Sequence, residues 1–135
     1  MQRTLIVLKP DAVQRGLCGD ILSRFEKRGF KIAALKLLTV SKELAEQHYA
    51  EHSEKPFFPG LVEFITGAPS VAMILEGQDA IALSRQMIGA TNPLQAEMGT
   101  IRGSLTNDKQ FNLIHGSDSP EAAERELKLW FPEAI

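Results

Sequence analysis

A short apolar run close to the N-terminus, residues 4–8 (TLIVL), is the feature that most limits what this chain can fold into. Its residues are β-branched or aliphatic, which is the pattern of a strand buried in a sheet. Pro10 follows shortly after and cannot donate a hydrogen bond to a strand ladder, so the strand must end and the chain must turn at Lys9 and Pro10. The fold therefore needs a sheet whose other strands come from later in the chain.

The rest of the sequence supplies these strands in alternation with helices. Further strands are predicted at residues 31–40, 71–75 and 111–115. Helices are predicted at residues 20–29, 41–50, 61–65, 79–89 and 120–131, with Ser41 and Asp79 as N-terminal caps. This order resembles the split βαβ plan, so we predict an α+β, ferredoxin-like fold with a four-stranded antiparallel sheet and helices packed on one face. No repeat or linker interrupts it, which predicts a single domain over residues 1–135.

Composition and charge exclude several classes of protein. Of the 135 residues, 44% are hydrophobic and 24% are charged, which is typical of a globular chain and not of a disordered one. The net charge of −2 would not draw the chain to nucleic acid or to an acidic membrane, so an anion site needs a local group of Lys and Arg. No apolar run is long enough to span a bilayer. The single cysteine, Cys18, and the absence of a signal sequence predict a cytoplasmic protein.

The segment 112–118 (NLIHGSD) combines several reactive side chains with a change of secondary structure. His115 closes the last predicted strand, and Ser119 and Pro120 then have the pattern of an N-cap and a first helical residue. His115 should therefore lie where a rigid strand aims it and a turn leaves it accessible. A histidine in such a place can be a nucleophile, a general base or a metal ligand.

The other two histidines do not complete a metal site. His48 and His52 are four residues apart and would share a helix face. The sequence HYAEH, however, does not have its glutamate directly after the first histidine, as the zinc motif His-Glu-x-x-His does, and no third ligand is placed nearby. Paired histidines without the rest of a motif are usually surface residues, and we predict this for His48 and His52.

Scattered cations indicate a phosphate-binding site without a familiar signature. Lys9, Arg85 and Arg102 are all expected at the ends of elements, where together they would suit a chain of phosphates. The glycines Gly16 and Gly19 are not followed by the Lys-Ser or Lys-Thr of a P-loop, and protein-kinase motifs are absent. If this chain transfers phosphate, a nucleophilic histidine is the natural candidate.

Ordered blocks of sequence carry a resemblance to one enzyme family. The blocks are LKPD (8–11), RG (15–16), RFE (24–26), HY (48–49), KPFFPG (55–60), TNP (91–93), GTIR (99–102) and NLIHGSD (112–118). Together they resemble the nucleoside diphosphate kinases, from residue 3 to about residue 131. The intact catalytic positions favour an enzyme over two alternatives, a non-catalytic nucleotide-binding module on the same fold and a regulatory or nucleic-acid-binding protein.

The resemblance implies a reaction and a set of catalytic residues. The family moves the γ-phosphate of a nucleoside triphosphate to a nucleoside diphosphate by a ping-pong route, here through a phosphohistidine on His115. Ser117 and Glu126 match the residues that orient the imidazole. Tyr49 and Lys9 match residues beside the reacting phosphate.

The same resemblance implies how a nucleotide would bind. The phosphate contacts are matched by Lys9, Arg85, Thr91 and Arg102. Phe57 matches the residue that stacks on the base, which explains low base specificity because every base offers a π face. Lys9 and Asn112 match the contacts to the ribose. Mg²⁺ is implied as cofactor, and Asp118 either reaches it indirectly or caps the last helix.

The resemblance also implies self-association. The family builds hexamers or tetramers from a common dimer, and we expect a homo-oligomer of one of these kinds. Pro93 lies in the long segment that contacts neighbouring subunits in the hexamers, which favours a hexamer.

Overall fold

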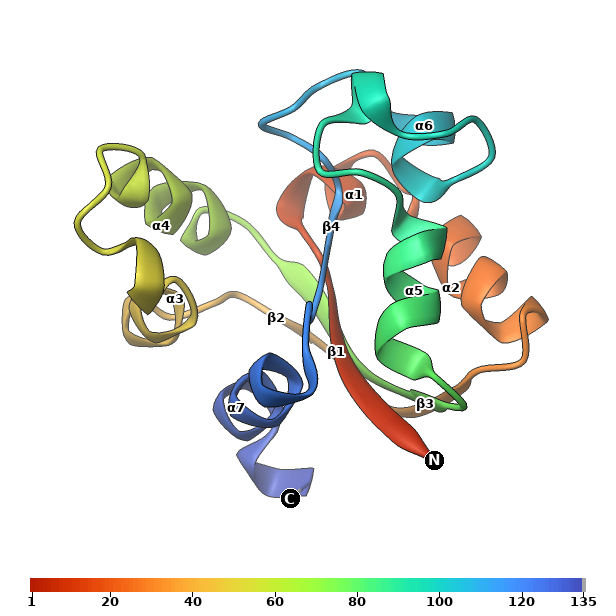
Figure 1. Ribbon diagram of the computed structural model, residues 1–135. Helices are drawn as coiled ribbons and strands as arrows, with labels where there is room; N and C mark the ends of the chain where they lie inside the picture. The colour runs from red at the N-terminus through yellow and green to blue at the C-terminus, as the bar shows by residue number, and fades with distance from the viewer. Residues whose placement is uncertain (135) are drawn as a thin grey trace.

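A four-stranded antiparallel sheet forms the centre of the protein (Figure 1). The computed structural model describes residues 1–134. The strands are β1 (Gln2–Leu8), β2 (Lys31–Leu38), β3 (Ser70–Gly77) and β4 (Ile114–Gly116), in the spatial order β2-β3-β1-β4. Every neighbouring pair is antiparallel. The predicted sheet and its split βαβ plan are confirmed.

The helices lie on both faces of this sheet, so the expectation of one covered face was wrong. On one face, Ile6 and Leu8 of β1 pack in a cluster with Phe25 of a helix. On the other face, Leu5 and Val7 pack in a second cluster that contains Trp130. The reason lies in the run 4–8 itself: a strand without alternating polar residues needs cover on both sides.

Figure 1 shows which helices cover each face. The helices are α1 (Pro10–Gln14), α2 (Cys18–Lys27), α3 (Lys42–His48), α4 (Phe58–Thr66), α5 (Ala80–Ile88), α6 (Ile101–Leu105) and α7 (Pro120–Trp130), with short 3₁₀ turns η1 (Ala50–His52), η2 (Pro93–Gln95) and η3 (Pro132–Ala134). Helices α2 and α5 lie on one side of the sheet, and α3, α4 and α7 lie on the other. Within residues 1–134, no helix has the length and apolar character needed to cross a membrane.

The predicted helix starts are largely confirmed by their caps. The Ser41 side chain accepts a hydrogen bond from the Leu44 amide at the start of α3, and that of Ser119 accepts one from Ala122 at the start of α7. Asp79 does precede α5, but its side chain makes no capping bond and its backbone is left-handed, with φ of 52°. The capping role predicted for Asp79 was therefore wrong.

The strand that carries His115 is shorter than predicted. The sequence indicated residues 111–115, whereas β4 spans Ile114–Gly116. Leu113 has φ of +75°, which no strand residue adopts, and this conformation delays the start of the ladder. His115 consequently pairs with Val7 in the middle of β4, and not at the end of a long strand.

Candidate active site

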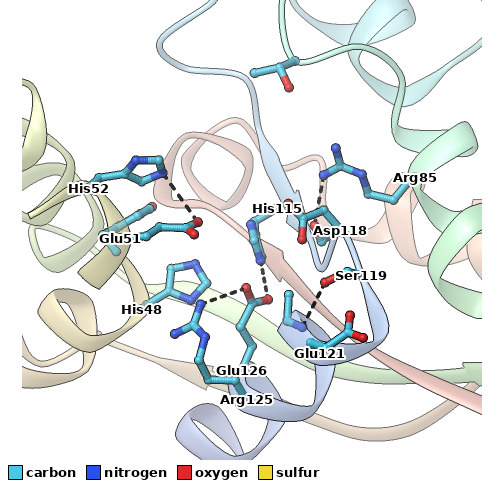
Figure 2. A pocket seen from close by; sticks show the side chains of 14 residues that line it. His48, Glu51, His52, Arg85, His115, Asp118, Ser119, Glu121, Arg125 and Glu126 are labelled. Carbon is cyan, nitrogen blue, oxygen red and sulfur yellow. Dashed lines mark hydrogen bonds and ion pairs between the residues drawn. The ribbon is translucent and has the colours of Figure 1, made fainter. Parts of the chain in front are cut away.

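His115 faces a cavity of about 510 Å³ that is built by several elements (Figure 2). Strand β4 supplies His115 and Gly116, and α7 supplies Glu126. Arg85 of α5 and Thr91, which follows that helix, lie on the same cavity. Histidine, carboxylate and arginine thus come from separate parts of the sequence to one hollow.

A buried carboxylate holds one nitrogen of the His115 ring. His115 Nε2 lies 2.8 Å from Glu126 Oε1, and the Ser117 hydroxyl donates to the same oxygen over 2.8 Å (Figure 2 shows the His115–Glu126 pair). Ser117 is itself fixed by β1, because its hydroxyl accepts from the Leu5 amide at 3.4 Å. Since Nε2 is engaged, Nδ1 is the ring nitrogen left for chemistry.

The surroundings keep this carboxylate ionised. Burial on its own would raise the pKa of the Glu126 carboxyl. The hydrogen bonds from His115 and Ser117, together with the charges of His115 and His48, outweigh burial and lower the pKa below its usual value. A buried negative charge therefore lies against the imidazole, where it stabilises positive charge that develops on the ring.

A second histidine packs on the first, and the sequence did not predict it. His48 is 6% exposed, and its ring lies edge-on to the His115 ring with centroids 4.6 Å apart. Its Nδ1 accepts a hydrogen bond of 3.1 Å from the Trp130 indole. The prediction that His48 is a surface residue was wrong. The sequence did contain one indication that His48 belongs to the site, because the HY block (48–49) is among the blocks that resemble the family.

Burial and charge make His48 a neutral group. Burial, reinforced by the charge of His115, lowers the pKa of His48 to about 3. Ligand atoms of His48, His115 and Glu126 lie within 4.8 Å of one another, close enough to suggest a metal centre. One nitrogen of the His48 ring already accepts the hydrogen bond from Trp130, and one nitrogen of the His115 ring is bonded to Glu126. The close approach of the three groups is thus explained by hydrogen bonds, and His52 is not part of the group.

Lys9, Asn112 and Arg102 form a polar group beside the cavity. The Lys9 ammonium donates to Asn112 Oδ1 at 3.0 Å, and the Asn112 amide donates to the carbonyl of Thr91 at 3.2 Å. Burial, together with the nearby charge of Arg102, lowers the pKa of Lys9 to about 8. The group is tied to the cavity through Thr91, which lines it.

Arg102 is a buried cation that bonds to the backbone of the segment carrying His115. Its side chain donates to the carbonyls of Asn112 (3.1 Å), Ile114 (2.6 Å) and Gly89 (3.2 Å), and the residue is 5% exposed. The guanidinium thus holds the backbone on both sides of Leu113 as well as supplying positive charge near Lys9.

The remaining predicted residues divide between the cavity and its margin. Tyr49 and Asp118 line the cavity. Burial raises the pKa of Tyr49 to about 12, so its phenol keeps its proton. Asp118 is exposed, and the capping bond of α7 comes from Ser119 and not from Asp118. Phe57 lies outside the lining at the start of α4, 52% exposed, with its ring 5.6 Å from that of His52.

Comparison with known proteins agrees with this geometry. A model of the nucleoside diphosphate kinase family matches residues 2–135. The chain belongs to the nucleoside diphosphate kinase family. It is 62% identical to a nucleoside diphosphate kinase of Thermosynechococcus vestitus, over 97% of this chain and 87% of that protein. It is also 62% identical to one of Carboxydothermus hydrogenoformans, over 98% of this chain and 89% of that protein.

Solved structures show the same fold. A nucleoside diphosphate kinase family protein from Babesia bovis superposes with a TM-score of 0.96 at 48% identity, covering 98% of this chain and 90% of that one. A halophilic nucleoside diphosphate kinase from Halobacterium salinarum, solved in complex with CDP, gives 0.93 at 52% identity, covering 96% and 87%. The chain is therefore an enzyme that transfers phosphoryl groups between nucleoside tri- and diphosphates, and a phosphohistidine intermediate is a general property of its family.

Proposed function

We propose that His115 is the residue of this chain that carries the phosphoryl group between nucleotides. The observation that supports it most is the pairing of His115 Nε2 with the buried Glu126 carboxylate, which leaves Nδ1 for attack. As Nδ1 bonds to the γ-phosphorus, the bond from that phosphorus to the bridging oxygen breaks and a nucleoside diphosphate leaves. A second diphosphate then attacks the phosphohistidine in the reverse sense.

Glu126 and Ser117 act on the ring in this proposal. When Nδ1 forms its bond to phosphorus, positive charge appears on the imidazole. The Glu126 carboxylate accepts a hydrogen bond from the Nε2–H group and stabilises that charge. Ser117 donates to the same carboxylate oxygen and fixes its orientation. Tyr49 borders the cavity and steadies either the phosphate or the neighbouring ring.

Positive and polar groups around the cavity are suited to hold the phosphates. Arg85 and Thr91 line it directly, and Lys9 and Arg102 supply charge from the adjacent group. Charge-assisted hydrogen bonds of this type are the strong ones and stabilise charge on a phosphoryl group in transfer. Asn112 accepts a hydrogen bond from Lys9, and we propose that the two residues share the contact to the ribose.

Phe57 is the proposed platform for the base. Its ring is half exposed at the start of α4, and stacking on an aromatic face does not distinguish one base from another. We therefore propose that the enzyme accepts many nucleotides.

Magnesium fits this site only as a partner of the bound phosphates. The carboxylates on the cavity are dispersed side chains, with Asp118 exposed on the side next to Arg85 (Figure 2). Mg²⁺ keeps several waters and takes one or two carboxylates plus phosphate oxygens, so such a site suits it without a dedicated cage. When bound, the ion supplies neutralisation of the phosphate charge. Asp118 would reach it indirectly.

We also propose a homo-oligomer, as either a hexamer or a tetramer built from dimers, and a cytoplasmic location. Strand β2 is an edge of the sheet, and Leu35 and Leu37 on it are 51% and 66% exposed. An exposed edge with apolar side chains is a surface that proteins usually cover. Leu94, next to Pro93, is 78% exposed in the long loop, which supports contacts between subunits there too.

The proposed cytoplasmic location is supported by the free thiol of Cys18, which suits a reducing compartment.

A labelling experiment tests the role of His115. Brief incubation with γ-labelled ATP and no acceptor should leave label on the protein that is lost in acid and stable in alkali, as a phosphoramidate is. His115→Ala should take up none. His52→Ala, a second histidine on the same cavity, is the matched control and should still be labelled. Label that sits stably on Ser117, or a labelled His115→Ala, would contradict the proposal.

A further inference from the structure

The backbone just before the nucleophile makes a turn that side-chain-bearing residues rarely adopt. Leu113 has φ of +75°, and the Ile114 amide donates to the Asn112 carbonyl across it at 2.9 Å. These features define a γ-turn of the rare, strained kind. Leu113 is fully buried, so the position needs its side chain for the core and cannot simply be a glycine. Such strain persists only where the surroundings impose it.

A buried carboxylate from the other end of the chain holds this turn. Asp11 Oδ2 accepts a hydrogen bond of 3.0 Å from the Leu113 amide, although the two residues are 102 positions apart. The Leu113 carbonyl accepts from the Lys9 amide at 2.8 Å. Asp11 is 8% exposed, and its Oδ1 has no hydrogen-bond partner among residues 1–134. The Leu113 N–H is therefore the long-range hydrogen-bond donor to this carboxylate, and the amides of Asp11 and Ala12 at the start of α1 also favour its charged form.

The clamped turn lies between the two halves of the site. Asn112 precedes the turn and bonds to the Lys9 ammonium, and His115 follows it by two residues and bonds to Glu126. The conformation of Leu113 consequently sets the distance and direction from the nucleotide contacts to the nucleophile. A relaxed, extended Leu113 would displace one relative to the other.

We propose that Asp11 is a positioning residue for phosphoryl transfer, which holds Leu113 in the γ-turn and so fixes His115 relative to Lys9 and Asn112. The inference rests on the proposed role of His115. Asp11 acts through the backbone and touches no reacting atom.

A second route from Asp11 to the site must be separated from this one. The Asp11 charge also favours the charged form of Lys9, against the effect of burial. Asp11→Asn distinguishes the routes, because an amide oxygen still accepts from the Leu113 N–H but carries no charge. Asp11→Ala removes both the acceptor and the charge.

The test measures single-turnover labelling of His115 by ATP, together with steady-state kcat and KM. We expect Asp11→Ala to slow phosphohistidine formation by about 10- to 100-fold, since a displacement of about 1 Å can cost a factor of that size. The fall in kcat should exceed the change in KM. Asp11→Asn should stay within about threefold of the wild type, because one neutral hydrogen bond replaces a charged one. Exchange of the Leu113 amide with deuterium should be faster in Asp11→Ala and close to wild type in Asp11→Asn.

Two further variants keep the test decisive. Asp11→Val replaces the carboxylate by an apolar side chain that is closer to it in size than leucine and has no acceptor, and serves if Asp11→Ala does not fold. Phe30→Leu is the control for general loosening, because Phe30 is buried beside Gly77, at the far end of β3. At an equal loss of Tm, Phe30→Leu should transfer phosphate much faster than Asp11→Ala.

Three results would overturn the inference: a normal rate in Asp11→Ala, an Asp11→Asn as slow as Asp11→Ala, or a Phe30→Leu as slow at equal Tm. A wild-type enzyme that takes no label on His115 is a different failure. It would remove the proposed role of His115, whereas a labelled wild type with an unaffected Asp11→Ala would remove only the role of Asp11.

Discussion

At the scale of single residues, burial sets the charge of the basic side chains in the site. His48 is buried against Trp130 and stays neutral, with a pKa lowered to about 3. Lys9 is partly buried beside Asn112, and desolvation together with the charge of Arg102 lowers its pKa to about 8. A positive charge is therefore suppressed on His48, next to the proposed nucleophile His115. The positive charge of Lys9 is retained at neutral pH in the group that we propose binds phosphates, but its pKa lies closer to neutral pH than that of an ordinary lysine.

The lowered pKa of Lys9 predicts an alkaline limit on the free enzyme. As pH rises through about 8, Lys9 loses its proton and with it a charge that holds the phosphates, so kcat/KM should fall. Lys9→Arg keeps a charge throughout this range, because a guanidinium does not deprotonate there. Profiles of kcat/KM between pH 6 and 10 should show the limit in the wild type and not in Lys9→Arg. The same limit in both proteins would exclude Lys9 as its source.

The buried neutral His48 predicts a loss of stability in acid. The pKa of the residue is about 3 in the folded chain, from burial and then from the charge of His115, whereas an unperturbed histidine titrates near 6.5. Between these values the unfolded chain binds a proton that the folded chain does not, so stability falls as pH falls, by up to about 1.4 kcal/mol per pH unit from this group. Urea unfolding between pH 4 and 7 measures that slope.

A glutamine at position 48 isolates this contribution from the other titrating groups. Glutamine stays neutral at all pH values and can still accept from the Trp130 indole, so His48→Gln should show a shallower dependence. His52→Gln changes the partly exposed neighbouring histidine and leaves His48 in place, so it should keep the full slope. Equal slopes in wild type and His48→Gln would show that His48 does not remain neutral by burial.

At the scale of elements, the sequence predicted what depends on local pattern and missed what depends on distant partners. The strands, the Ser41 and Ser119 caps and the placement of His115 near a strand–helix junction follow from nearby residues. The turn at Leu113 does not, because an apolar side chain gives no sign of a positive φ that Asp11 and Arg102 impose from elsewhere.

The histidines of α3 and η1 show the same division within the candidate site. The predicted helix ends at His48 and His52 lies in the separate turn η1, so the expectation that they share a helix face was wrong. Their spacing also did not indicate which of them would be buried. His48 packs under Trp130, 82 residues later, while His52 remains partly exposed near Phe57. The resemblance to a family named several residues that the structure brings to the cavity or beside it, whereas the spacing of the histidines did not indicate that His48 would be buried and neutral.

At the scale of the whole molecule, a net charge of −2 coexists with a local group of cations. Arg85 of α5, Arg102 of α6 and Lys9, which follows β1, each donate a hydrogen bond to a backbone carbonyl between Leu113 and Gly116, so the fold gathers them around β4. The same topology leaves β2 at the edge of the sheet, away from this site. Substrate binding and self-association can therefore use separate surfaces.

The exposed leucines of β2 predict that self-association is sensitive to charge at this edge. Wild-type protein should sediment at a multiple of the mass of one chain. Leu35→Glu/Leu37→Glu should shift it to a smaller species, because a carboxylate cannot be buried unpaired in an apolar contact. Both side chains are more than half exposed in a single chain, so the variant should still fold.

Met98→Glu, at a 91% exposed methionine of the long loop, is the matched control for added charge elsewhere. If β2 forms the dimer contact, Met98→Glu should retain at least the dimer, whereas the double variant should not. A wild type that sediments as a monomer, or a double variant of unchanged mass, would exclude this edge as the contact between copies.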